Sequence, residues 1–163
     1  GVLAKFKTPP AKAVTELEVI SYDTAIDLYK IALYTSVVKK GKNSEKAYTC
    51  LKIAWLLRGK MEEMTLDAEK NKDAIAACQK DYDTFYQQAF DGFVKAMASE
   101  TYPMAGMDQS TMDLLIAALA YNLGQYEYSA RFVSQLIVSH TAPSNVKNRA
   151  HDLKEKIVAK LKK

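Results

Sequence analysis

The segment STMDLLIAALAYNLGQYEYSARFVSQLIV, residues 110–138, contains two apolar helical patterns on either side of Gly124. Before the glycine, Met112, Leu115 and Leu119 are spaced by three and four residues, as on one face of an α-helix. A second pattern with helical spacing follows the glycine. Because so short a connection forces two helices to lie antiparallel and adjacent, the segment predicts a helical hairpin.

Glycines also mark expected helix ends elsewhere in the chain. A basic residue followed by glycine, as at Lys40-Gly41 and Arg58-Gly59, is typical of a helix C-terminus. The stretch 61–99 has no Pro and a single Gly, so it is predicted to be one unusually long helix. Its charged first half is expected either to project beyond the body or to rest on it along a narrow stripe. The expected helices span residues 22–40, 44–58, 61–99, 108–122, 126–139 and 144–162.

The composition supports an all-α fold. Six Gly and four Pro among 163 residues are little turn material for a many-stranded fold. Hydrophobic residues make up 48% of the chain and charged residues 26%, which excludes disordered and fibrous classes. No apolar run reaches the roughly 18–20 residues that a membrane span needs. Cys50 and Cys78 are predicted to be buried thiols in a reducing compartment.

The chain divides into two expected regions. Residues 1–20 are predicted to form an N-terminal arm, because Pro9-Pro10 disfavours a helix there, and residues 21–163 a helical domain. The chain begins with Gly1 rather than Met, which suggests that it is part of a longer protein.

The turn at Gly124 resembles that of a tetratricopeptide repeat (TPR). The residues that carry this resemblance are Leu123-Gly124-Gln125-Tyr126 and the small residue Ala130, although Ala130 lies one place later than the motif would have it. The resemblance implies a TPR-like repeat array of about six antiparallel helices, one of them long. The alternative is an irregular helical bundle in which the Leu-Gly-x-Tyr sequence is a coincidence.

Three segments resemble an uncharacterised family of Gram-positive bacteria, domain-of-unknown-function family 2225. They are AIDLYKIAL at residues 25–33, CLKIAWLLR at residues 50–58 and LGQY at residues 123–126. The resemblance implies that family members consist of a cysteine-containing, zinc-binding N-terminal segment joined to a TPR-like helical region. Residues 21–163 match only the helical region. The resemblance implies a cytoplasmic bacterial protein and no particular activity. No zinc role is carried over, because the chain has no cluster of metal ligands.

No motif in the sequence predicts catalysis. His140 and His151 have no Cys, Asp or Glu at a metal-ligand spacing. The chain also lacks a Gly-x-Ser-x-Gly nucleophile motif and the glycine-rich loops that hold phosphates. The acidic pairs lie on the expected long helix, where a solvated face is the simpler interpretation. We therefore expect no enzymatic activity, no cofactor and no metal.

The preferred hypothesis is a non-catalytic module that binds a protein or peptide. Stacked helix pairs produce an extended concave surface, here lined by the helices expected at 44–58 and 108–122. Trp55 is predicted to be a core residue whose replacement by Ala costs roughly 3–5 kcal/mol. The sequence predicts neither the partner's identity nor the oligomeric state. The candidate partner-binding residues are Lys46, Thr49, Lys52, Arg58, Tyr121 and Asn122.

An alternative function follows from the basic C-terminus. Residues 144–163 carry seven Lys and Arg against two Asp and Glu, which is a possible footprint for nucleic acid or another anion. The segment has no aromatic residue on which a base could stack. A solvated end-capping helix is the simpler interpretation, so nucleic acid is the less favoured partner.

Overall fold

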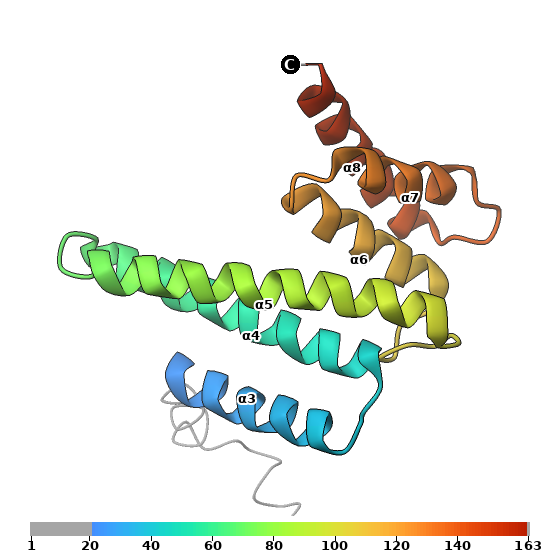
Figure 1. Cartoon of the computed structure of the whole chain (residues 1–163). Coiled ribbons are helices and arrows are strands. Elements are labelled where there is room, and N and C mark those ends of the chain that lie inside the picture. Colours follow the sequence, from blue (N-terminus) through green and yellow to red (C-terminus); the bar gives the residue numbers. More distant parts are fainter. Residues whose placement is uncertain (1–20, 163) are drawn as a thin grey trace, which may run out of the picture.

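The computed structural model describes residues 21–162, which form six α-helices and one short 3₁₀ helix (Figure 1). The predicted all-α class is confirmed, since these residues contain no β-strand. The N-terminal arm predicted for residues 1–20 lies outside the described residues. The elements are α3 (Tyr22–Val38), α4 (Asn43–Met64), η1 (Thr65–Asp67), α5 (Lys72–Ser99), α6 (Gln109–Asn122), α7 (Tyr126–Val138) and α8 (Ser144–Leu161).

Helices α4 and α5 form a long antiparallel pair, which is the most extensive contact between two elements. Figure 1 shows the pair running side by side, with α3 along one flank of α4 and α6–α8 at the end opposite the hairpin tip. Small residues let the two backbones approach closely: a Cβ atom added at Gly92 would lie 2.9 Å from the Cβ of Ala47. Leu51 and Phe93, both fully buried, fill the same core.

The expected long helix is present as α5, which has 28 residues, but its predicted start at residue 61 is wrong, since α5 begins at Lys72. Helix α4 continues through Gly59 to Met64, and a turn over residues 65–71 precedes α5. The reason is tertiary: Leu57 and Met61, one turn apart, extend the buried face of α4 against α5 beyond the glycine. The charged segment forms the hairpin tip, which projects from the body, the first of the two expected arrangements, and carries the 88%-exposed Leu66.

A carboxylate that follows the C-terminus of α5 caps the N-terminus of α4. Glu100, just after α5, accepts hydrogen bonds from the Ser44 hydroxyl at 2.6 Å and from the Ser44 backbone N–H at 3.0 Å. A helix N-terminus favours such an anion, because its first N–H groups have no partner within the helix. The contact fixes the point from which the chain leaves for α6.

Helices α6, α7 and α8 contact one another pairwise. Gly124 takes a positive φ of 77° at the α6–α7 turn, a conformation that L side chains rarely adopt. The small residue buried where the two helices meet is Ser129, whose hydroxyl donates to the Ala117 carbonyl at 2.6 Å; the neighbouring Ala130 is only half-buried. Helix α8 packs on α6 and α7 through one apolar stripe, of which Val146, Ala150, Leu153 and Ile157 are buried, whereas Leu161 at its end is 52% exposed.

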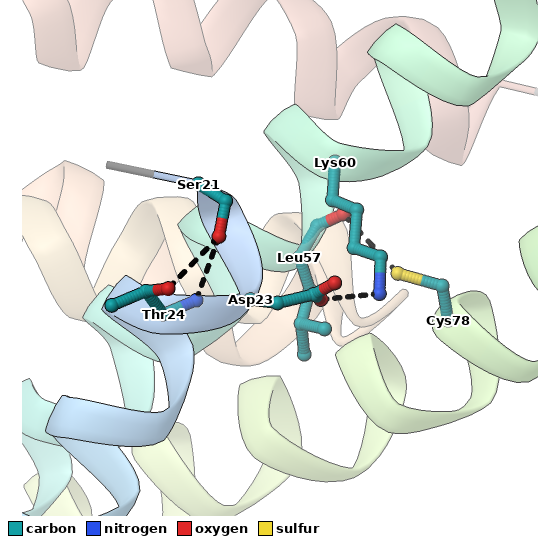
Figure 2. A network of polar contacts seen from close by, with 6 residues as sticks. All are labelled: Ser21, Asp23, Thr24, Leu57, Lys60 and Cys78. Atoms are coloured by element: carbon teal, nitrogen blue, oxygen red, sulfur yellow. Dashed lines mark hydrogen bonds and ion pairs between the residues drawn. The ribbon is translucent and has the colours of Figure 1, made fainter. Parts of the chain in front are cut away.

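Helix α3 is held on α4 by one buried side chain, Ile26, and by polar contacts at its N-terminus. Figure 2 shows the ion pair between Lys60 Nζ and Asp23 Oδ1, which are 2.6 Å apart, and the Cys78 thiol donating to the Leu57 carbonyl at 3.4 Å. The hydrogen bond from Lys60 to Asp23 raises the pKa of Lys60, and burial raises the pKa of Cys78.

The two glycines of the α4–α5 pair should respond oppositely to alanine. Gly92→Ala should lower the free energy of unfolding by about 1 kcal/mol or more, because the new methyl group meets Ala47 and must push the helices apart. Gly59→Ala should be neutral or stabilising, since its methyl group meets only the exposed ring of Tyr22 while helix propensity improves. Urea unfolding of both variants measures this; equal effects would contradict the close packing at Gly92.

Asp113 on α6 predicts a pH dependence of stability. The residue is only 9% exposed, and burial raises the pKa of its carboxyl to about 6 from 3.8. The folded protein therefore holds this proton more tightly than the unfolded chain, so stability falls as the pH rises from about 4 to about 6.

Asp113→Asn should remove that contribution and stabilise the protein at pH 7 by roughly 1–3 kcal/mol. Unfolding measured between pH 4 and 7 for both proteins tests this. An unchanged pH slope in the variant would contradict it.

Candidate functional site: an apolar groove between α4, α6 and α8

An open groove of about 460 Å³ lies where the helix pair α4–α5 meets the three C-terminal helices. This volume is within the roughly 300–1,000 Å³ typical of ligand sites. Most of the lining side chains are apolar, and the charged ones come from α8 alone. The lining residues are Tyr48, Leu51, Trp55, Met107, Thr111, Leu114, Leu115, Ala118, Arg149, Asp152, Leu153 and Lys156.

Trp55 belongs to this groove and not to the core, which corrects the prediction. Its side chain is 40% exposed, whereas Leu51, one turn earlier, is fully buried. Helix α5 covers one part of the circumference of α4, where Ala54 is buried. Helix α3 covers another part, where Ile53 is buried. Trp55 lies just beyond the buried arc, on the side that faces α6 and α8.

Aromatic and cationic contacts hold the α4 side of the groove. The rings of Tyr48 and Trp55 meet edge to face, with their centroids 6.4 Å apart. Lys52 Nζ lies 4.4 Å from the centroid of the Tyr48 ring and 5.5 Å from that of Tyr29 on α3. A cation over an aromatic face is attractive, so Lys52 helps to hold the Tyr48 ring in place, and Tyr48 in turn packs against Trp55.

The α8 side of the groove is charged. Arg149, Asp152 and Lys156 are spaced by three and four residues, and they therefore share one face of the helix. The ion pair between Lys60 and Asp23 is the only one within residues 21–162, so Arg149 and Lys156 have no carboxylate partner there. Two bases and one acid give this edge of the groove a net positive charge.

The six residues predicted from sequence do not line the groove. Lys52 comes nearest, through its contact with Tyr48. Lys46 lines a separate shallow depression between α4 and α5. The Thr49 hydroxyl donates to the Glu45 carbonyl within α4, at 3.0 Å. Their place on α4 was foreseen, but the groove uses a different face of that helix.

The other three predicted residues make contacts within the fold. Asn122 Nδ2 donates to the Tyr86 hydroxyl at 2.7 Å and so joins α6 to α5. The Tyr121 ring packs on Tyr126, with centroids 5.5 Å apart, across the Gly124 turn. Arg58 is exposed and lies beside the Tyr82 hydroxyl, whose pKa it lowers against the larger effect of burial.

Sequence reasoning missed most of the groove residues because an apolar side chain in a groove obeys the same helical spacing as one in a core. One signal was present: Tyr48 and Trp55 are seven residues apart and form a stripe to one side of the buried positions of α4. Arg149 and Lys156 share the same seven-residue spacing on α8.

The buried titratable groups with raised pKa values, Asp113 and the two cysteines, do not line the groove. Burial raises the pKa of Tyr102, and the charge of Asp113 adds to that increase. Cys50 and Cys78 are buried free thiols, as predicted, and burial raises the pKa of both. A raised pKa keeps a thiol protonated and weakly nucleophilic. Within the described part of the chain, no three His, Cys, Asp or Glu side chains are grouped to hold a metal ion.

Trp55→Ala should cost the fold less than a core substitution would. With a 40%-exposed side chain, we expect a loss of roughly 1–2 kcal/mol in the free energy of unfolding, against roughly 3–5 kcal/mol for a buried Trp. Phe93→Ala, at a fully buried position, provides the comparison and should be the more destabilising change. Denaturant titration of both variants measures the difference; equal losses would place Trp55 in the core.

Comparisons with known proteins identify a family and nothing more specific. No curated protein and no solved structure matches the chain significantly. None of the helices between residues 21 and 162 has the length and apolar character needed to cross a membrane. A family model matches residues 4–157, so the matched region also includes most of the expected N-terminal arm. Because this match covers nearly the whole chain, the protein belongs to the family described as uncharacterized protein conserved in bacteria (DUF2225).

Proposed function

We propose that this protein is a non-catalytic interaction domain that binds a segment of a partner protein in the groove between α4, α6 and α8. The observation that carries the proposal is Trp55, which is 40% exposed within an apolar groove. Trp, Tyr and Arg are the residues that most often dominate binding energy at interfaces, and all three line this groove. When a ligand covers a half-exposed indole and the apolar side chains beside it, the apolar surface removed from water makes the free energy of binding more favourable.

The charges of the groove favour a particular partner. Arg149 and Lys156 make no ion pair with the described residues, and Asp152 only partly offsets them. A partner segment with one or two bulky apolar side chains and neighbouring Asp or Glu would match both the apolar floor and the basic edge. The volume of about 460 Å³ suits a few side chains rather than a folded domain.

The TPR-like arrangement belongs to the same proposal. The pairwise contacts of α6, α7 and α8, the Leu-Gly-x-Tyr turn and the buried Ser129 at the helix crossing all support it. TPR-like stacks commonly bind peptides on a surface formed by several helices, as the groove here is. The cytoplasmic location and the Gram-positive origin implied by the sequence resemblance remain expectations of this proposal.

Peptide selection tests the proposal. A displayed peptide library selected on the wild-type chain and counter-selected on Trp55→Ala should enrich sequences that combine a bulky apolar residue with Asp or Glu. Trp55 is the only tryptophan in the chain, so quenching or a blue shift of its fluorescence reports occupation of the groove directly. Failure to enrich any peptide, or equal binding by Trp55→Ala, would overturn the proposal.

Charge reversal on α8 separates the groove from a general attraction to anions. Arg149→Glu should weaken binding of a selected acidic peptide about tenfold. Lys154→Glu makes the same charge change on the same helix at an exposed position outside the groove, and it should have little effect. If both variants weakened binding equally, with a steep dependence on salt, the alternative of an anion- or nucleic-acid-binding C-terminal helix would be favoured instead.

A further inference from the structure

The outer face of α3 is a second apolar surface, separate from the groove. Leu28, Ile31, Tyr34 and Val38 are 60%, 63%, 72% and 63% exposed, respectively. Their spacing of three, three and four residues places them in one stripe along the helix. The buried residue Ile26 lies on the opposite face, against α4. We refer to these four residues as the α3 stripe.

The two ends of the described helical array differ in this respect. Helix α8, at the C-terminal end, buries a single stripe and presents mainly charged side chains to solvent, as a terminal helix of a stack requires. Helix α3, at the other end, is apolar on both faces. A continuous apolar stripe that is exposed on a helix marks an interaction surface, whereas scattered single apolar residues do not.

We propose that the α3 stripe pairs with the α3 stripe of a second copy of this chain, in antiparallel orientation about a two-fold axis. Such an interface is formed by the same patch on both subunits, so the patch must be self-complementary. The α3 stripe meets this requirement, because its apolar residues extend over most of the helix, with acidic residues near the N-terminal end of α3 and basic residues just after its C-terminal end. The remaining charge, Lys30 in the middle of α3, lies over the Phe85 ring of α5, 5.7 Å from its centroid.

The charge distribution selects the antiparallel orientation. Asp23 and Asp27 lie in the first half of α3, whereas Lys39 and Lys40 follow its last residue. Antiparallel packing brings the acidic end of each helix beside the basic end of the other, and it also aligns the helix dipoles favourably. Parallel packing would place like charges together. Asp23 is already paired with Lys60, so Asp27 is the acid that is available to a second copy.

The size of the α3 stripe predicts a weak, reversible dimer. The 17 residues of α3 span roughly 25 Å, so one helix face buries well below the roughly 800 Å² per partner of a standard interface. We expect a monomer at about 1 µM and a dimer in the range of about 100–500 µM. This inference is independent of the groove, whose ligand would bind on the other side of α4.

Sedimentation measurements on the full chain across this concentration range test the dimer. Ile31→Glu should abolish it while leaving the melting temperature unchanged, since Ile31 is 63% exposed and Glu is compatible with a helix. Leu66→Glu is the matched control: it places the same charge at an exposed apolar residue on the hairpin tip, and it should dimerise like the wild type.

Charge reversal tests the orientation of the two helices. Asp27→Lys and Lys39→Glu should each weaken dimerisation by about tenfold, because each contact occurs twice in a two-fold dimer and its loss counts twice. The variant that combines both substitutions should restore dimerisation. A monomer at all concentrations would overturn the proposal, as would a dimer that persists in Ile31→Glu. A monomer that Ile31→Glu destabilises would also overturn it and would show that the α3 stripe is covered within the chain.

Discussion

The close antiparallel packing of α4 on α5 is the constraint on which the rest of the structure depends. Ala47 and Gly92 bring the two backbones together at one end of the pair, and Leu57 and Cys78 continue the contact towards the tip. At the end opposite the tip, Glu100 binds the first turn of α4, so the chain leaves α5 in a fixed place. The contact of Glu100 with α4 therefore determines where α6 begins, and the position of α6 determines the groove.

The packing also explains how the groove between α4, α6 and α8 arises. Helix α4 is covered on two sides, by α5 and by α3, and its third side meets α6 and α8 only partly. The gap leaves apolar side chains such as Trp55 open to solvent, with the basic edge of α8 beside them. The buried titratable groups, Asp113 and the two cysteines, do not line this gap.

The two proposed surfaces lie on different sides of the same helix pair. The groove contains a tryptophan among smaller side chains and a charged edge, which is typical of a site that recognises a short segment. The α3 stripe is a row of exposed side chains along one helix, and such a surface fits another helix better than an inserted side chain. A domain with both could bind its partner as a pair of copies and gain avidity from doing so.

The sequence by itself determined the all-α class, the approximate positions of most helices, the Gly124 turn and the burial of both cysteines. These features follow from local spacing, because residues three and four apart share a face whatever the surroundings. Only the tertiary structure decided that α4 continues through Gly59 to Met64, since the reason is the contact of Met61 with α5. It also decided that Trp55 lines a groove and that the outer face of α3 is open, because which side of an apolar helix is covered depends on where the other helices lie.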